Sequence, residues 1–244
     1  MTDPQSAASV AARWLSLVEE STRGMLQSVS ALLPEAVAEP SALPGWTRGH
    51  VLAHLSRNAD SLVNLLTGAR TGTDIPQYAS EQARDQGIED GAGRPLDEQL
   101  ADLRESHERF AAAAGLMTDE DWAAEVRHRS GAVFPACDLV WKRLGELEYH
   151  LVDLDAGYGP QRWPEVFAVT EFHKLAVTLH GTDLPAVELV AEDTGDLGLI
   201  GTGEPALTVR GPVRALLAWL SGRSDGADLK HTPDIALPRL PPLG

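Results

Sequence analysis

The residue types and spacing in the segment Trp141–Leu154 indicate a metal site. Glu146 and His150 are four residues apart, and on a helix this spacing puts a carboxylate and an imidazole on one face. Upstream, His54 lies roughly two turns inside another expected helix, so a hairpin or bundle would bring the three side chains together. Two histidines and one glutamate suit a zinc ion that keeps an open position for water or a thiolate, which is typical of catalytic sites.

Spacing alone leaves other interpretations open. Glu146 and His150 also fit a surface pair that adds a few tenths of a kcal/mol to a helix. His50 lies four residues before His54, so the sequence by itself does not choose between these two histidines. Asp153 shares roughly the face of His150, where it fits either a carboxylate that holds the outer ring nitrogen of a ligand or a solvated aspartate.

Composition and charge exclude several classes of protein. The chain has 244 residues, of which 36 are acidic and 20 basic, and its formal charge of -16 repels a polyanion. We therefore expect no nucleic-acid partner. No segment approaches the roughly 18 apolar residues of a membrane span and the N-terminus lacks the order of a signal peptide, so we expect a cytoplasmic protein with no membrane partner. The single Cys137 cannot form an internal disulfide and has no adjacent basic residue, so we expect it to pack rather than react.

Hydrophobic periodicity predicts four long helices in the first part of the chain. They span about residues 5–33, 47–68, 96–114 and 135–157. Thr47 is a good N-cap for the second helix, and Pro135 is expected to open the fourth. The stretch between the second and third helices is punctuated by Gly and Pro and holds one short helix across residues 80–88. Four such helices describe a bundle.

The pattern changes after about residue 160. A helix over residues 163–180 is followed by two strands, 187–191 and 206–210, and by a final helix over 212–220. The ending, residues 233–244, holds four prolines and is not expected to form regular structure. The sequence therefore predicts an α+β protein with a four-helix bundle in residues 1–160 and a smaller α/β domain, with an extended tail, in residues 161–244.

Four segments carry a family resemblance. They are Gly45-Trp46-Thr47 through His54, the loop Gln77–Arg84, Arg143 through Glu146 and His150 to Asp153, and Val209–Leu220. At these residues the chain resembles the mycothiol-dependent maleylpyruvate isomerases, metal enzymes with a DinB-like four-helix N-terminal domain and a small α/β C-terminal domain. The likeness extends over nearly the whole length. It implies that His54, Glu146 and His150 are metal ligands and that Arg84 is needed for activity.

One position departs from the family pattern, and two arginines have open roles. Glu148 stands where an apolar or aromatic residue is expected, although its helical position turns it away from the face of Glu146 and His150. Arg84 and Arg143 fit ordinary surface charges, but a substrate with two carboxylates needs planar, bidentate donors, and an arginine in a cleft-side loop supplies one. We therefore expect Arg84 to act on the substrate and leave the role of Arg143 open.

The resemblance implies a thiol-dependent cis–trans isomerase that converts maleylpyruvate to fumarylpyruvate. The reaction would proceed by reversible thiolate addition at a divalent metal, zinc by preference, with mycothiol or another low-molecular-weight thiol as cosubstrate. The expected partners are a small dicarboxylate and a thiol, and we expect a monomer. Two alternatives remain: a thiol S-transferase that conjugates an electrophile, and a non-catalytic metal-binding bundle whose site is closed by a fourth ligand such as His50 or Asp153.

Overall fold

The chain forms two compact units, Met1–Tyr158 and Gly159–Gly244, in a computed structural model that describes residues 3–241. The first unit is mainly helical, and the second combines helices with a sheet, so the expected α+β class is confirmed. Within the described residues no helix is both long enough and apolar enough to cross a membrane.

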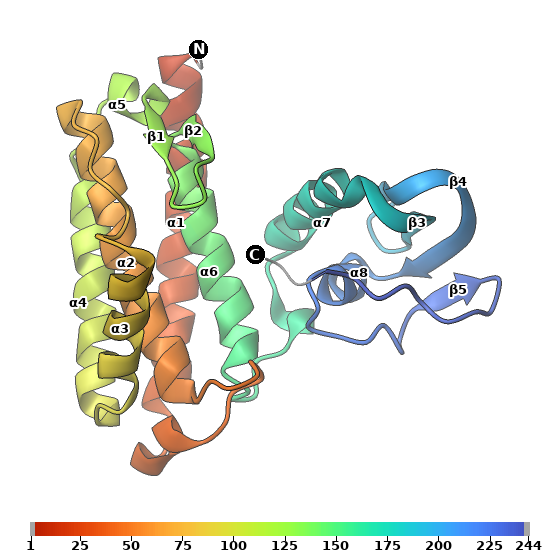
Figure 1. Cartoon of the computed structure of the whole chain (residues 1–244), viewed down its shortest axis with the longest axis horizontal. Helices are drawn as coiled ribbons and strands as arrows, with labels where there is room; N and C mark the ends of the chain where they lie inside the picture. The colour runs from red at the N-terminus through yellow and green to blue at the C-terminus, as the bar shows by residue number, and fades with distance from the viewer. Residues whose placement is uncertain (1–2, 242–244) are drawn as a thin grey trace. The chain divides into compact units, whose positions relative to one another are not determined.

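Four long helices build the first unit (Figure 1). They are α1 (Pro4–Ser30), α2 (Arg48–Thr71), α4 (Leu96–Gly115) and α6 (Asp138–Asp153). Helix α2 packs against α4, α1 packs against α6, and α2 also contacts α6. Their apolar faces meet in a core that includes Val18, Leu55, Leu103, Phe110, Leu144 and Leu147. The predicted bundle is confirmed, and it brings the second and fourth long helices into contact.

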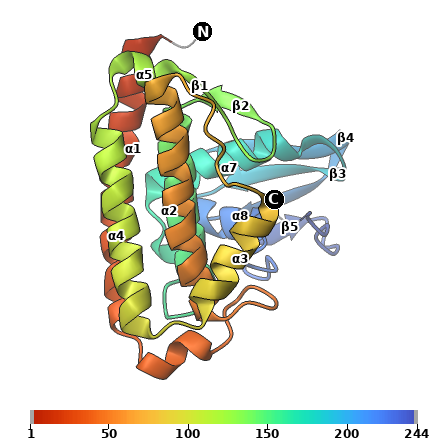
Figure 2. The same cartoon turned by 60° about the vertical axis from the view of Figure 1, so that its left-hand side comes forward.

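Shorter elements cover the bundle. They are the 3-10 turn η1 (Pro34–Ala38), α3 (Glu81–Ala92), α5 (Asp119–Ala123) and the hairpin of β1 (Glu125–Arg127) with β2 (Val133–Pro135). Helix α3 packs along α2 (Figure 2). The loop before α3 is tied to α2, because Asn64 Nδ2 donates to the Gln77 carbonyl at 3.1 Å and Gln77 Nε2 donates to Ser61 Oγ at 3.2 Å.

The ends of α2 follow from local chemistry. Thr47 is the N-cap, as predicted, and its hydroxyl accepts from the backbone N–H of His50. The helix runs one turn beyond the expected end near Gly68 and stops at Gly72, which adopts φ 64°. Glycine reaches this left-handed conformation at little cost, so it terminates the helix.

The start of the fourth long helix differs from the prediction. Pro135 does not open it, because Pro135 lies in β2 and α6 begins at Asp138. Backbone hydrogen bonds from Ala136 to Ala124 and from Cys137 to Trp122 hold this segment extended beside α5. Proline tolerates an edge strand of this kind, since it has no N–H to leave unpaired there. The sequence reading also missed α5 and the hairpin.

The second unit places helices against a small sheet. After the turn η2 (Pro160–Arg162), the elements are α7 (Glu165–Leu179), β3 (His180–Ala191), β4 (Leu197–Gly211), α8 (Val213–Leu220) and β5 (Lys230–Thr232). Both α7 and α8 contact β3 and β4, and the sheet order is β3-β4-β5. The core is formed by Trp163, Phe167, Phe172, Val187, Leu189, Val209, Leu216 and Leu217.

Strand β4 is longer than predicted because it bends. Its second part pairs in parallel with β3, from Val187 beside Leu207 to Ala191 beside Gly211. Its first part pairs antiparallel with β3, from Val187 beside Ile200 to Val190 beside Leu197. At the bend Gly201 has φ 73°, and a Cβ there would lie 2.2 Å from the Pro185 carbonyl oxygen, so the position requires glycine. The short strand β5 was not predicted. Residues 233–241 form no helix or strand, as expected, and the predicted tail's residues 242–244 lie outside the described part.

Candidate metal centre and substrate pocket

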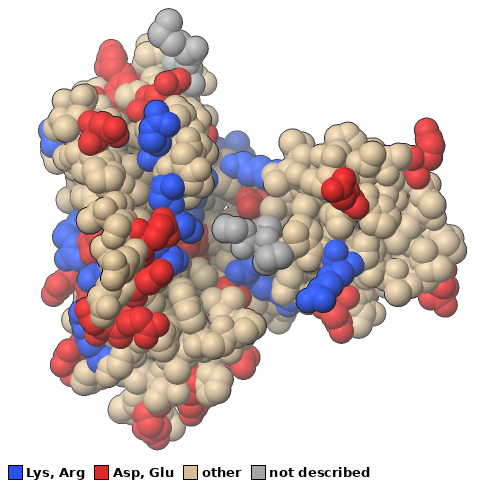
Figure 3. Space-filling view, viewed as in Figure 1, with Lys and Arg blue, Asp and Glu red and all other residues tan. Residues whose placement is uncertain are grey.

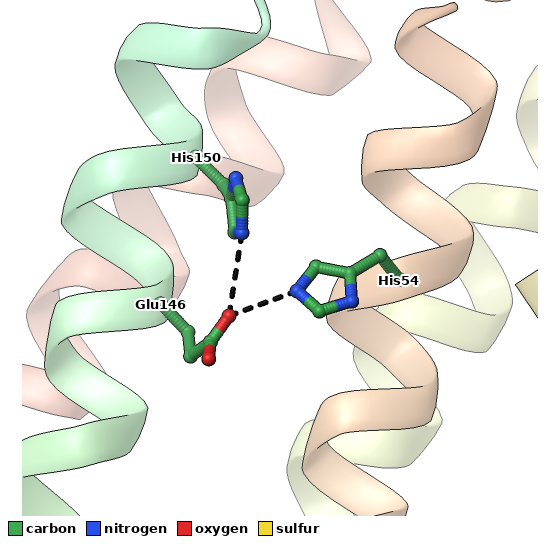
Figure 4. A group of neighbouring side chains, drawn as sticks. All are labelled: His54, Glu146 and His150. Carbon is green, nitrogen blue, oxygen red and sulfur yellow. Dashed lines mark hydrogen bonds and ion pairs between the residues drawn. The ribbon is translucent and has the colours of Figure 1, made fainter. Parts of the chain in front are cut away.

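Three side chains with metal-binding atoms face one another between α2 and α6 (Figure 4). His54 Nε2 lies 2.9 Å from Glu146 Oε2, and His150 Nε2 lies 3.3 Å from the same oxygen. One ligand atom from each residue lies within 4.8 Å of the others, and no second such group occurs in residues 3–241. The two imidazole rings meet edge to face, with centroids 4.7 Å apart. The fold thus brings together the three residues expected from the sequence, which we call the triad.

Burial and mutual contact set the charge of the triad. Burial lowers the pKa of His54 below its ordinary value, although the contact with Glu146 opposes this shift. Burial would also lower the pKa of His150, but hydrogen bonds with Asp153 and Glu146 outweigh it and raise that pKa. For Glu146, burial disfavours the charge, yet the bonds from both imidazoles hold its pKa well below the usual range. The site therefore offers an ionised carboxylate beside an imidazole, His54, that favours its neutral form.

Asp153 orients one of the two imidazoles. It is buried, and its Oδ2 lies 2.9 Å from His150 Nδ1. With an ionised Asp153 the proton sits on Nδ1, so the lone pair of Nε2 points toward the other members of the triad. His54 Nδ1 is buried as well, but it has no hydrogen-bond partner in the described part of the chain. The protein therefore fixes the tautomer of His150 more firmly than that of His54.

His50, the alternative ligand by spacing, lies outside the triad. Its Nδ1 accepts from the Thr47 backbone N–H at 3.1 Å and lies 2.7 Å from the Thr47 hydroxyl, while its Nε2 lies 3.5 Å from Glu89. His50 thus helps to cap α2. Trp46 packs beside both histidines, with ring centroids 6.1 Å from His50 and 5.5 Å from His54. Of the two histidines that spacing could not separate, His54 lies in the triad and His50 does not.

The geometry of the triad fits a divalent ion of the zinc type. Ligand atoms bound tetrahedrally at about 2.0–2.1 Å lie about 3.3 Å apart, close to the 2.9 and 3.3 Å that separate Glu146 Oε2 from the two nitrogens. Among the described residues no fourth His, Cys, Asp or Glu joins the group. Asp153 contacts the far nitrogen of His150 instead. An ion held here would keep a position open for another ligand.

A pocket of about 220 Å³ is lined by α2, by the loop that leads into α3 and by the first turn of α3. Its walls are formed by Arg57, Asp60, Ser61, Asn64, Gln77, Tyr78, Ala79, Ala83 and Arg84. Two of these residues are within electrostatic reach of the triad. Burial is the main cause that lowers the pKa of His54, and the charge of Arg84 lowers it further. Burial is also the main cause that raises the pKa of Tyr78, and the charge of Glu146 raises it further. No triad residue lines the pocket, but Arg57 and Ser61 lie about one and two turns after His54 on α2, so the pocket continues along this helix from the triad.

Arg84 brings a cation to this pocket from an acidic helix. Figure 3 shows Asp and Glu side chains gathered over α3, which carries Glu81, Asp85, Glu89 and Asp90. Arg84 is the only basic residue of α3; its side chain is 17% exposed, and its Nη1 donates to the exposed Asp85 at 2.8 Å. An anion that approaches α3 is repelled except where this planar, five-donor group meets it.

Arg143 is a buried residue that connects two helices by hydrogen bonds and not a surface charge. It is fully buried, and its Nη1 donates to the Leu55 carbonyl and to Asn58 Oδ1, both at 2.9 Å. Burial lowers its pKa to about 10, so the group stays protonated at neutral pH. Its Nε and Nη2 have no hydrogen-bond partner among the described residues. Arg143 thus links α6 to α2 one turn before Glu146, which answers the role that the sequence left open.

Glu148 and Cys137 lie away from the triad. Glu148 is buried on the opposite side of α6, where its carboxylate accepts from the Ser21 hydroxyl and, at 2.7 Å, from the Tyr158 hydroxyl. Burial raises the pKa of Glu148, and the contact with α1 accounts for a polar residue at a position expected to be apolar. Cys137 is buried, and burial together with the Asp138 charge raises its pKa. A thiol in this state is a poor nucleophile, as expected from the sequence.

Sequence reasoning missed most of the pocket wall. Ser61 and Asn64 follow His54 at helical spacing on α2, and this periodicity could have placed them near the same face. Tyr78 and Gln77 stand in an irregular loop, where no periodic signal fixes the direction of a side chain. Only the resemblance of the loop Gln77–Arg84 pointed toward them.

Comparisons with known proteins agree with this architecture. The family model of the mycothiol maleylpyruvate isomerase N-terminal domain matches residues 18–155, and that of the C-terminal domain matches residues 159–241. The two units of this chain therefore correspond, in order, to the two domains of a known enzyme class. The chain belongs to the mycothiol maleylpyruvate isomerase family.

Solved structures of similar proteins support the same assignment. A crystal structure of the mycothiol-dependent maleylpyruvate isomerase superposes with a TM-score of 0.89 at 26% identity, covering 96% of this chain and 97% of that one. A mutant of that enzyme in which a histidine is replaced by alanine gives a TM-score of 0.88 over the same coverage, also at 26% identity. A comparison with curated proteins gave no significant match.

Proposed function

We propose that this protein is a mycothiol-dependent maleylpyruvate isomerase, which converts a cis double bond conjugated with a carbonyl into the trans form. The observation that carries the proposal is the triad with an open position, set beside a pocket that contains Arg84, in a chain whose two units both match this family. The solved relatives with the same two-unit fold are described as mycothiol-dependent maleylpyruvate isomerases.

His54, Glu146 and His150 would hold one divalent ion, and zinc suits two imidazoles and a carboxylate best. Such an ion supplies positive charge that lowers the pKa of a thiol bound beside it. Asp153 positions His150 for this task, as its hydrogen bond to Nδ1 indicates. The low-molecular-weight thiol is a substrate of the first step and a product of the last.

The proposed isomerisation balances without an oxidant or reductant. The thiolate sulfur forms a bond to the alkene carbon that is β to the ketone, and the π-electron pair moves through the neighbouring carbon to the ketone oxygen. The former double bond is now single and rotates. The enolate then re-forms the ketone and the double bond in the trans arrangement, and the sulfur leaves as thiolate. No proton is gained or lost overall.

Arg84 would bind a substrate carboxylate during this cycle. The guanidinium presents several N–H donors in one plane, which matches the geometry of a carboxylate. Only Nη1 is engaged with Asp85 among the described residues, so the remaining donors are available for the ligand. Fixing one end of the substrate in this way positions the alkene for attack.

The observations favour this reading over a closed metal site. His50 and Asp153, the residues that could have completed a four-ligand cage, both have other partners. An S-transferase would share the triad and the first addition step, but it would release a thioether and consume the thiol.

Mass spectrometry of reaction mixtures tests the proposal and separates these outcomes. Maleylpyruvate is incubated with the metal-loaded protein and with mycothiol, glutathione or no thiol in parallel. We expect fumarylpyruvate to form with mycothiol while the thiol is recovered in full. A thioether that accumulates in proportion to turnover would establish the transferase, and absence of any conversion with every thiol would refute both activities.

A further inference from the structure

The pocket beside the triad contains one neutral hydrogen-bond donor that the proposed cycle has not used. Tyr78 lines this pocket together with Arg84. Its side chain is half-buried, and its hydroxyl is within hydrogen-bonding reach of Ser61. The chemistry proposed above places negative charge on a ketone oxygen, and such an oxygen needs a donor in a site that excludes water.

The other polar side chains of the pocket are engaged within the protein. Arg57 Nη2 pairs with Asp102 at 2.6 Å and with Asp60 at 3.2 Å, and Asp60 also accepts two hydrogen bonds from Arg109. These contacts neutralise the charges of Arg57 and Asp60 and fix both side chains on the wall.

The uncharged residues of the wall are engaged in the same way. Asn64 and Gln77 form the bonds that hold the loop to α2, and Gln77 Oε1 also accepts from the backbone N–H of Arg129 at 3.1 Å. The Ser61 hydroxyl donates to the Asn58 carbonyl at 2.8 Å. Apart from the buried Nε of Arg57, which has no hydrogen-bond partner among the described residues, Arg84 and Tyr78 are the side chains whose donors can turn to a ligand.

The proton of Tyr78 is available at neutral pH. The Ser61 hydroxyl, which acts on the pKa of Tyr78, already donates to the Asn58 carbonyl and accepts from Gln77 Nε2, so it does not need the phenolic proton. A hydrogen bond to an anionic oxygen is roughly twice as strong as one to a neutral oxygen. Burial also raises the pKa of Tyr78, so the phenol remains protonated. An enolate oxygen in the pocket would therefore be a stronger acceptor for this proton than any neutral oxygen of the wall.

We propose that Tyr78 donates a hydrogen bond to the ketone oxygen of the substrate as that oxygen becomes an enolate, while Arg84 holds the carboxylate. This assignment rests on the proposed function and adds a substrate requirement to it: an α,β-unsaturated ketone that also carries a carboxylate. The phenolic proton stays on Tyr78 or moves to the enolate oxygen and returns, so the balance of the reaction does not change. Tyr78 acts on the transition state more than on the bound substrate.

The variant Tyr78→Phe tests the proposal, since it removes only the hydroxyl. We expect kcat for maleylpyruvate to fall about 100-fold, the usual loss for one donor to a developing oxyanion, while KM changes by less than about threefold. Metal content should equal that of the wild type. Tyr158→Phe is the matched control, because its hydroxyl binds Glu148 away from the pocket, and its kcat should stay within about twofold of the wild type. An unchanged kcat in Tyr78→Phe would overturn the proposal.

A binding measurement separates this proposal from the proposed function. Acetopyruvate has the dioxo-acid end of the substrate and a strongly enolised ketone, but it lacks the alkene and cannot isomerise. We expect calorimetry to show about tenfold weaker binding of acetopyruvate to Tyr78→Phe than to the wild type, whether or not maleylpyruvate is turned over. Equal affinities would show that Tyr78 does not bind the ketone oxygen. If the wild type fails to isomerise maleylpyruvate but the tenfold difference in acetopyruvate binding is found, only the proposed reaction is refuted.

Discussion

At the scale of single residues, the two imidazoles of the triad are held differently, and this difference makes Asp153 testable. Asp153 bonds to His150, whereas His54 Nδ1 has no partner among the described residues. We expect Asp153→Asn to weaken metal binding about 10- to 100-fold, since the amide does not stabilise the bound imidazole as a carboxylate does. Competition with a chromophoric chelator measures this affinity. An affinity equal to that of the wild type would show that the Asp153 contact has no part in metal binding.

The raised pKa of His150 predicts how the metal responds to pH. A histidine must be neutral to bind a metal. In the metal-free protein the pKa of His150 lies above the ordinary histidine value of about 6.5. On acidification, protons therefore begin to compete with the metal ion for His150 above about pH 6.5. Affinity should therefore fall as pH drops through this window and recover on return to pH 8. In Asp153→Asn, which removes a cause of the raised pKa, the affinity is weaker at pH 8 but should begin to fall only at a lower pH; an affinity of the wild type that stays constant down to about pH 5 would contradict histidine ligation.

Arg84 is expected to serve the substrate and not the metal. Arg84→Lys keeps the charge but removes the planar set of donors, so we expect kcat/KM for maleylpyruvate to fall by about 10- to 100-fold with unchanged metal content. Arg94→Lys is the control, because Arg94 pairs with Asp102 and does not line the pocket. Equal kinetics in the two variants would reduce Arg84 to a surface charge.

At the scale of elements, the start of α2 carries one histidine that caps the helix and another that belongs to the triad. Thr47 and His50 cap this helix, whereas His54 lies beyond its first turn in the triad. We expect Thr47→Ala to lower the free energy of unfolding by about 1 kcal/mol and His50→Ala to lower it as well, both without loss of bound metal. His54→Ala should lose the metal. Urea unfolding together with metal analysis measures both effects, and metal loss in His50→Ala with retention in His54→Ala would reverse the assignment.

The long elements could be predicted from the sequence, whereas the shortest ones could not. The long helices were predicted because their apolar stripes repeat over several turns, and His54, Glu146 and His150 could be grouped because their spacing fits those helices. The strands β1, β2 and β5 have only three residues each, too few to show an alternating pattern. Pro135 was misread for this reason. Tyr78 and the buried Arg143 depend on tertiary contacts across the bundle, which periodicity does not encode.

At the scale of the whole molecule, the chain supplies the triad and a pocket but no reactive sulfur of its own. Cys137 is buried with a raised pKa and is not one of the residues that line the pocket. The proposed chemistry therefore depends on a soluble thiol that leaves unchanged, and this dependence is the central claim of the account.

The most direct test is an assay of maleylpyruvate turnover by the purified wild-type protein and by Cys137→Ala. Each protein is assayed first without mycothiol and then after mycothiol is added. The account predicts no fumarylpyruvate from either protein without mycothiol, and comparable turnover by both once it is added, with the mycothiol recovered in full. Turnover by the thiol-free wild type that Cys137→Ala abolishes would show that the chain carries its own nucleophile and would contradict the account.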